Sequence, residues 1–282
     1  MTSGAANRTA PAAAPPSRLE RGRRRLVAAT SEPSLVAYYG DRQAAGHGPL
    51  AFAVRHPART AAALAAVLRL PRLRADLPAR GPGCGEAETD AVRAALLSRS
   101  FGVPMACTGV SVLPVPADPE DVVAGRAKQT LRRKIRAAQR RGTTTRLVTD
   151  PGEREALLEL ARRCERKHPD EVYRTAEPEV EDLPGYALWM VAQDSRGTPL
   201  LLAVIPASGQ WAVLRYFRTL GFDPEHSDSR YLATADLARE LAARGVRHLA
   251  DTSHPAALTP GLRHFQRMLG FRLHRVTVRR VG

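Results

Sequence analysis

The chain has 282 residues and a formal net charge of +15 at pH 7, and 44% of its residues are hydrophobic but only 5% aromatic. This length allows one large domain or two small ones, and the hydrophobic share is enough for a buried core. No apolar run reaches the length of a bilayer span, and the three cysteines form no C-x-x-C pair. We therefore expect a cytoplasmic protein without a transmembrane segment, a disulfide framework or a metal site.

The positive charge is concentrated in three segments. Residues 1–25 contain six arginines and one glutamate, residues 126–141 contain eight basic residues and no acid, and residues 263–280 contain six arginines and no acid. Such segments favour a polyanionic partner, which can be RNA, DNA, an acidic membrane or a phosphorylated substrate. The scarcity of aromatic residues within them favours phosphate contacts over base stacking.

The first part of the sequence has weak structural signals. Residues 1–32 are rich in alanine and proline and then in arginine, which predicts a disordered basic tail. Residues 33–117 are interpreted as an N-terminal α/β region. We expect a strand at Ala51–Val54, a helix at Ala58–Leu70, a loop at Pro71–Gly85, a helix at Glu86–Leu97 and a strand at Val110–Val115.

A basic amphipathic helix is predicted from Asp118 to Arg141. Asp118-Pro119 is a strong helix start, the following apolar residues keep to one stripe, and Gly142 is suited to end the helix. The opposite face is almost continuously basic. Its predicted RNA-binding residues are Lys128, Arg132, Arg133, Lys134, Arg136, Arg140 and Arg141.

The elements after this helix mix helices and strands without regular alternation. We expect a strand at Thr143–Thr149, a helix from Asp150 to Lys167 and a loop at 168–185. Strands at Tyr186–Ala192, Pro199–Ile205 and Gln210–Phe217 should follow, and then a loop at 218–229. The last predicted elements are a helix at Arg230–Arg244, a strand at Val246–Ala250, a helix from Thr259 to Leu269 and a strand at Phe271–Arg279. This order predicts an α+β fold with a mixed, mainly antiparallel sheet flanked by helices.

Three stretches of residues 118–282 resemble the FemAB-like branch of acyltransferases with the GNAT fold. They are LRRKIRAAQRRG at 131–142, YFRTLGFDPEHSDSRYLATADLARELAARGVRHLADTS at 216–253, and GLRHFQRMLGF at 261–271. The resemblance implies a GNAT-fold catalytic domain over 118–282. It also implies that 33–117 is a reduced second domain of the same kind, although no motif there carries it.

The resemblance implies a choice between two acyl donors. GNAT enzymes that use acyl-CoA hold its pyrophosphate in a Q/R-x-x-G-x-G/A turn before a helix. Arg218 and Gly221 match that turn here, but Asp223 stands where a small residue belongs, and its carboxylate would repel a pyrophosphate. This favours the donor of FemAB-like enzymes, aminoacyl-tRNA, as co-substrate with no bound cofactor. The acceptor would be an amine on a peptidoglycan precursor, a peptide or a natural product.

Candidate site residues cluster where strand 210–217 is expected to part from strand 246–250, with a backbone N–H there as oxyanion donor. Proton acceptors near this opening are Asp251, Asp223 and His254, and Tyr216 can donate a proton to the leaving oxygen. Each has a simpler interpretation: Asp251 as a loop cap, His254 as a surface residue and Tyr216 as part of the core. The predicted substrate-binding residues are Arg215, Arg218, Gly221, Glu225 and Tyr231.

Two other functions remain open from the sequence. One is an N-acyltransferase that uses acyl-CoA, which the matching Arg218 and Gly221 favour. The other is a non-catalytic nucleic-acid-binding protein in which the acyltransferase fold serves only as a scaffold.

Overall fold

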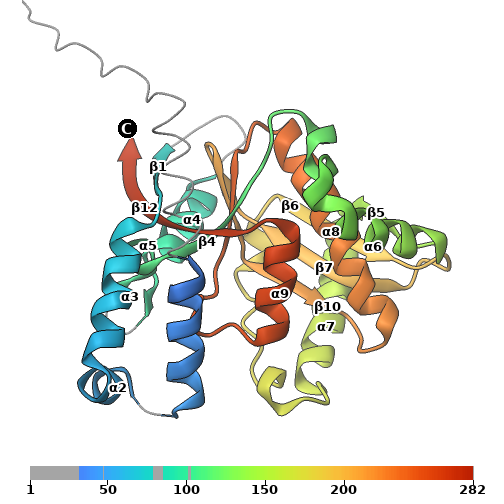
Figure 1. Cartoon of the computed structure of the whole chain (residues 1–282). Coiled ribbons are helices and arrows are strands. Elements are labelled where there is room, and N and C mark those ends of the chain that lie inside the picture. The colour runs from blue at the N-terminus through green and yellow to red at the C-terminus, as the bar shows by residue number, and fades with distance from the viewer. Residues whose placement is uncertain (1–31, 47, 79–84, 101–102, 282) are drawn as a thin grey trace, which may run out of the picture.

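The computed structural model describes residues 32–46, 48–78, 85–100 and 103–281 (Figure 1). The predicted basic tail, apart from Glu32, and Cys84 lie outside these residues. Within the described part, no helix is long and apolar enough to cross a membrane, and no three metal-binding side chains gather into a cluster.

Two sheets form the centre of the molecule. The first has the order β1 (Arg72–Pro78), β12 (Arg272–Val281), β4 (Val110–Pro114), β11 (His248–Asp251), β9 (Trp211–Leu214) and β8 (Ala207–Ser208). The second has the order β10 (Tyr216–Thr219), β7 (Pro199–Ile205), β6 (Leu188–Gln193) and β5 (Thr144–Leu147), and a short pair joins β2 (Arg99–Ser100) to β3 (Val103–Pro104). The pairs β1–β12 and β9–β11 are parallel and the other pairs are antiparallel. The predicted mixed, mainly antiparallel α+β fold is confirmed.

Helices cover both faces of the sheets (Figure 1). Successive residues of a strand point to opposite faces, so Met190 packs in the cluster of α6 (Gln129–Arg140) and α8 (Pro224–Ala243), while its neighbours Trp189 and Val191 pack in the cluster of α7 (Pro151–Arg166). A third cluster joins α4 (Glu86–Leu97) and α5 (Met105–Thr108) to the six-stranded sheet. The helix 32–44 and α3 (Pro57–Arg69) form a fourth with Leu273 of β12, and α2 (Pro49–Arg55) precedes α3.

Residues 33–117 share a sheet with the rest of the chain. β1 pairs with β12, and β4 lies between β12 and β11. A division of the chain at residue 117, with a second GNAT-like domain before it, stays a prediction.

Two predictions in this region are wrong. Ala51–Val54 belongs to helix α2, which begins at Pro49 and buries Phe52; the apolar run was too short to distinguish a strand from a helix. Arg72–Pro78, expected in a loop, is strand β1, with Ala75 and Leu77 buried and Arg74 and Asp76 exposed. This alternation is a strand signal that the nearby prolines and glycines obscured.

The predicted continuous helix from Asp118 to Arg141 is also wrong. The chain forms a 3-10 turn at Pro119–Val123, a second one at Arg126–Lys128, and only then α6. Gly125, with φ of 87°, breaks the helix because that conformation is easy only for glycine. Arg132 stabilises the break, since its Nη1 donates to the carbonyl oxygens of Val123 at 2.8 Å and Gly125 at 2.7 Å.

The later elements follow the predicted order with two differences that matter for the site. Strand 210–217 is divided at Arg215 into β9 and β10. Helix α8 begins at Pro224 rather than at Arg230, so residues 224–229 are helical instead of loop. Within the loop 168–185 the chain makes 3-10 turns at Glu171–Tyr173 and Leu183–Gly185, and α9 (Pro260–Leu269) precedes β12.

Candidate active site at the parting strands

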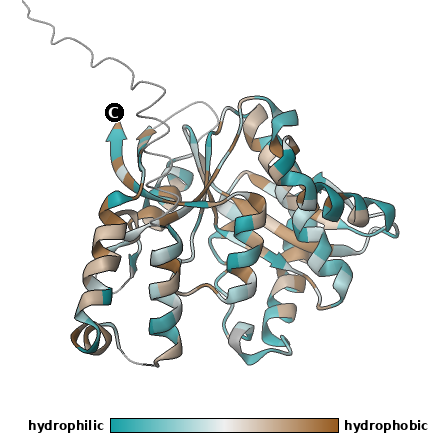
Figure 2. Cartoon of the chain, viewed as in Figure 1, coloured by the Kyte–Doolittle hydropathy of each residue, from teal (hydrophilic) through white to brown (hydrophobic). Residues whose placement is uncertain are grey.

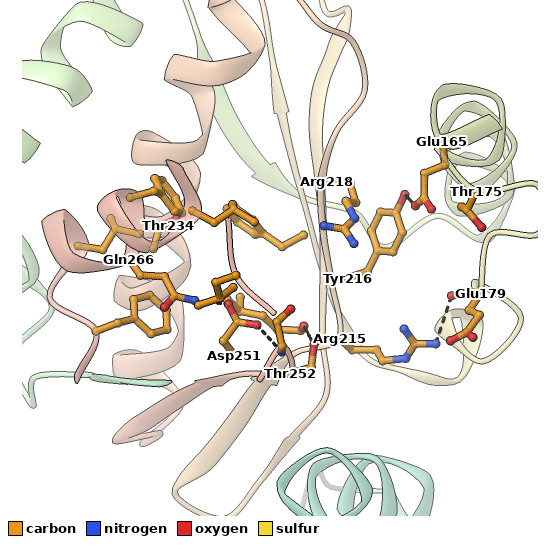
Figure 3. A pocket seen from close by; sticks show the side chains of 18 of the residues that line it. Glu165, Thr175, Glu179, Arg215, Tyr216, Arg218, Thr234, Asp251, Thr252 and Gln266 are labelled. Carbon is orange, nitrogen blue, oxygen red and sulfur yellow. Dashed lines mark hydrogen bonds between the residues drawn. The ribbon is translucent and has the colours of Figure 1, made fainter. Parts of the chain in front are cut away.

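The candidate site lies where two parallel strands separate. β9 pairs with β11 as far as Leu214 opposite Asp251, after which the chain bends at Arg215 and continues as β10, paired with β7. β10 is the outer strand of its sheet, so its second edge has no strand partner in the described part of the chain. A pocket of about 290 Å³ occupies the opening (Figure 3).

Both charged and apolar side chains line the pocket. Carboxylates come from Glu165, Glu177, Glu179 and Asp251, guanidinium groups from Arg215 and Arg218, and apolar surface mainly from Leu258, Leu262, Phe265 and Leu269. The loop after β11 is tied to β9, because Thr252 Oγ1 donates to Leu214 O at 3.1 Å.

Asp251 ends β11 and lines this pocket, at the opening where the sequence placed it. The Ser253 N–H donates to its Oδ1 at 2.7 Å, and Nε2 of the buried Gln266 donates to its Oδ2. Burial raises the pKa of the carboxyl above the ordinary value, although these two hydrogen bonds and the charge of Arg218 act in the opposite direction. A carboxylate that is fixed in place by hydrogen bonds and has a raised pKa is suited to accept a proton from a substrate.

Tyr216 lies on the opposite wall. Its hydroxyl donates to Glu165 Oε1 at 2.6 Å, and Figure 3 shows the ring directed toward Glu165 and away from Asp251. Burial, followed by the Glu165 carboxylate, raises the pKa of Tyr216, so the hydroxyl keeps its proton at neutral pH. Glu165 was not predicted, since within an amphipathic helix it is one of many charged residues.

The two predicted substrate-binding arginines differ. Arg215 is held by Asp182, with Nε and Nη2 each 2.7 Å from a carboxylate oxygen, and Asp182 also accepts from Tyr186. Arg218 is exposed, its side chain makes no hydrogen bond or ion pair with another described residue, and Figure 3 shows it pointing into the opening. Arg218 is therefore the cation that remains available to an anionic substrate group.

The turn before α8 differs from a phosphate-binding turn. A Cβ on Gly221 would lie 2.2 Å from Nε2 of His226, so the open face of this glycine is already filled by an imidazole. Asp223 is exposed at the N-cap position of α8, and Pro224 after it has no N–H to offer. Glu225 is exposed in the first turn. A carboxylate and an imidazole thus stand where a pyrophosphate would need backbone N–H groups.

Coenzyme A is accordingly expected to leave the thermal stability of the protein unchanged. A ligand present at 100 times its Kd stabilises by about 2.7 kcal/mol, which for a chain of this size raises Tm by about 5 to 10 °C. Differential scanning fluorimetry with and without millimolar coenzyme A measures the effect. A Tm increase in that range would show that the turn does accept a pyrophosphate.

Two other predicted site residues lie away from the pocket. The imidazole of His254 contacts Thr108 Oγ1 at 3.1 Å through Nε2, and Nδ1 accepts from the Ala256 N–H at 3.0 Å. Burial, and then the charge of Arg42, lowers the pKa of His254 to about 4, so this side chain fixes the loop after β11 in its neutral form. Tyr231 packs against Phe265, with ring centroids 5.1 Å apart, rather than lining the pocket itself.

The predicted RNA-binding face is less uniform than the sequence suggested. Lys134 and Arg141 both pair with Asp228, Arg132 caps the broken helix, and Lys128 donates to the carbonyl of Leu269. Arg133, Arg136 and Arg140 are exposed and have no ion pair within the described residues. No residue of 126–141 lines the pocket, but Lys128 contacts Leu269, which does.

Asp228→Asn is expected to lower the free energy of unfolding by about 1 to 3 kcal/mol, because it breaks a partly buried ion cluster that joins α6 to α8. Burial raises the pKa of Asp228, but hydrogen bonds from Arg141 and Lys134 outweigh it and leave the pKa lowered. This stabilisation is present above the unfolded-state pKa and is lost as pH falls through the folded-state pKa.

Urea unfolding at pH 7 and pH 3 measures this effect. Glu240→Gln, which removes the exposed Arg244–Glu240 pair of the same helix, is the control and should cost no more than about 0.5 kcal/mol at pH 7. Equal losses for the two variants would contradict a structural role for Asp228.

Three solved structures are distantly similar to this chain. No protein-family model matches the chain, and no curated protein sequence matches it. Among solved structures, L-PGS from Bacillus licheniformis is similar with 13% identity and a TM-score of 0.43 over 58% of this chain and 57% of the other. A C-terminal domain (DUF2156) named after lysylphosphatidylglycerol synthetase, from Agrobacterium fabrum, has 14% identity and a TM-score of 0.44 over 58% and 57%.

FemX is similar with 13% identity and a TM-score of 0.43 over 60% of this chain and 59% of its own. Each match therefore spans less than two thirds of the other protein. At this level of similarity, a function has to be inferred from the pocket itself.

Proposed function

We propose that this chain is an acyltransferase that moves an aminoacyl group from aminoacyl-tRNA to an amine and so forms an amide. The observation that carries the proposal is the pocket between the parting strands, which has an unpaired strand edge on one side and the Asp251 carboxyl on the other. These are the two groups that an acyl transfer to an amine requires, an oxyanion donor and a proton acceptor.

In the proposed reaction the amine attacks the ester carbonyl of the donor. The C–N bond forms, backbone N–H groups on the unpaired edge of β10 stabilise the oxyanion, and Asp251 accepts the proton from the attacking nitrogen. The C–O bond of the ester then breaks, and the leaving ribose hydroxyl takes the proton from Asp251. The ester is already activated, so most of the rate enhancement comes from alignment of the two reactants.

The charges in the pocket support this pair of substrates. Glu165, Glu177 and Glu179 line the pocket and favour the binding of an ammonium group, which loses one proton to solvent before it attacks as the neutral amine, while Arg218 is available to an anionic group such as the terminal phosphate of the donor. The turn before α8, filled by His226 and followed by the exposed Asp223 carboxylate, supports a donor other than acyl-CoA. The exposed Arg133, Arg136 and Arg140 supply positive charge for an RNA backbone.

The proposal is tested with tRNA charged with a mixture of labelled amino acids and a panel of amine acceptors. We expect the label to appear in a base-stable amide, and we expect treatment of the donor with ribonuclease before the assay to prevent this. Transfer that needs acyl-CoA instead of charged tRNA would contradict the proposal, as would an absence of transfer to every acceptor.

A further inference from the structure

An apolar surface covers the outer sides of α2 and α3. Leu50 and Val54 on α2 are 82% and 80% exposed, and Leu64 and Leu68 on α3 are 62% and 66% exposed. Each pair is four residues apart and therefore lies on one face of its helix. We use the name α2–α3 surface for these four aliphatic side chains and the two arginines beside them, Arg55 and Arg69.

The exposed aliphatic groups are not the result of poorly packed helices. The other side of α2 buries Phe52, and the other side of α3 buries Ala63 and Ala66, so each helix already contributes to the core. A surface helix normally has its polar residues on the side that faces water. Figure 2 shows brown and pale residues along both helices, which lie at the left edge of the molecule.

The charge around this surface has one sign. No acidic residue occurs between Asp41 and Asp76, whereas Arg55, Arg59 and Arg69 are exposed on the two helices. Arg59 pairs with Asp41, with Nη1 3.1 Å from Oδ2. The surface therefore combines four aliphatic side chains with arginines and carries no carboxylate of its own.

The combination of exposed aliphatic side chains and arginines favours one class of partner over a second copy of the chain or another protein. A second copy bound by the same surface would place arginines of the two copies against one another, and no acidic residue occurs in the sequence between Asp41 and Asp76 to pair across such an interface. Specific protein interfaces are rich in aromatic residues and hydrogen bonds, and the exposed residues here are mainly alanine, leucine, valine and arginine. An anionic bilayer offers both an apolar phase for the aliphatic groups and negative charge for the arginines.

We propose that the α2–α3 surface docks the protein on an anionic lipid bilayer, with both helices lying in the plane of the interface. At 7 and 13 residues the helices are too short to span a bilayer, which takes about 20. The docking does not depend on the proposed acyl transfer, and the two can fail separately.

Co-sedimentation of the full chain with vesicles tests the docking. One set of vesicles contains phosphatidylcholine alone, and the other contains about one quarter phosphatidylserine. We expect binding to the second set that weakens as salt is raised, and much weaker binding to the first. Leu64→Gln with Leu68→Gln should lower the partition coefficient by on the order of a hundredfold, although it leaves the net charge unchanged.

The control replaces exposed aliphatic residues elsewhere, Leu147→Gln with Val281→Gln, where the side chains are 38% and 47% exposed. It should bind as the unmodified chain does, which would show that the loss of binding is specific to the α2–α3 surface and does not follow from removing any exposed aliphatic groups. In a second measurement, Leu64→Trp should show blue-shifted emission when anionic vesicles are added, against the constant signal of the buried Trp189 and Trp211.

Three results would overturn the proposal. The first is equal vesicle binding by the unmodified chain and the Leu64→Gln, Leu68→Gln variant. The second is no binding of the unmodified chain to either set of vesicles. The third is a dimer in sedimentation equilibrium that this variant dissociates, which would identify a second copy as the partner.

Discussion

Asp251→Asn is expected to lower kcat for aminoacyl transfer by on the order of 10² to 10⁴, the usual contribution of a positioned general base. The asparagine keeps the size of the side chain and can still accept the Ser253 N–H, so the effect should fall on the chemical step rather than on the fold. Single-turnover transfer from charged tRNA measures it directly.

The pH dependence gives an independent test of the same role. Burial raises the pKa of Asp251, so the carboxyl keeps its proton to a higher pH in the folded protein than in the unfolded chain. Activity that needs the carboxylate should therefore rise with pH through a value above the ordinary aspartate pKa, and Asp251→Asn should remove this limb. The raised pKa also means that Asp251 favours folding less as pH rises, so the stability of the variant relative to the unmodified chain should improve with pH.

Asp223→Asn is the matched control. Asp223 was predicted as a second proton acceptor, but it is exposed at the start of α8 and does not line the pocket. Its replacement should leave kcat unchanged. If Asp251→Asn retains full activity, or if Asp223→Asn loses as much, the assignment of the base is wrong.

Reversing the charge of Arg133, Arg136 and Arg140 to glutamate should raise KM for charged tRNA by on the order of 10² to 10³ at low salt. These side chains are exposed and unpaired within the described part of the chain, so the substitutions remove phosphate contacts without breaking an internal ion pair. The slope of log affinity against log salt should fall by about one per lost contact. Fluorescence anisotropy of labelled tRNA over a salt series measures both.

The control for this triple variant is Arg72→Glu, Arg74→Glu and Arg93→Glu, which lowers the net charge by the same amount at exposed positions outside α6. It should leave the salt slope nearly unchanged. Equal weakening by the two variants would mean that tRNA responds to the overall charge of the chain rather than to α6.

Residue patterns at helix starts explain why several helical segments were predicted at the right place and why the start of α8 was not. Asp118-Pro119, Asp150-Pro151 and Thr259-Pro260 each begin a helical segment, with the side chain of the first residue accepting a backbone N–H. Asp223-Pro224 has the same residue types and begins α8, although the Asp223 side chain accepts no backbone N–H, and residues 218–229 were expected to form a loop. Because that start was missed, the loop that contains Gly221 was expected to continue to residue 229.

The part of the site on the strands was predictable, and the part made by tertiary contacts was not. The sequence placed Asp251 directly after one predicted strand and Arg218 directly after its neighbour, and the structure brings both residues to one opening. The hydrogen bond from Tyr216 to Glu165 joins residues 51 positions apart. The hydrogen bond from Gln266 to Asp251 joins residues 15 positions apart. Nothing in local periodicity encodes such pairs. The same is true of Asp228, whose ion pairs use Lys134 and Arg141, residues that the sequence assigned to RNA.

The break at Gly125 shows a further limit of sequence patterns. The apolar stripe continues through it, but Ala124 and Gly125 both leave the helical conformation and separate the first 3-10 turn from the second, which leads directly into α6. A single glycine inside a helical pattern is often tolerated, so its effect here depended on the contacts that Arg132 makes with the freed carbonyl groups.

The most direct measurement is a structure of the protein with a tRNA minihelix whose 3′ end carries the amino acid through a hydrolysis-resistant amide. We expect the aminoacyl carbonyl to lie in the pocket, with its oxygen about 3 Å from a backbone N–H on the unpaired edge of β10. The aminoacyl group should face the Asp251 carboxyl, and the helical RNA should contact α6. An aminoacyl end bound outside this pocket, or RNA that leaves α6 untouched, would contradict the account.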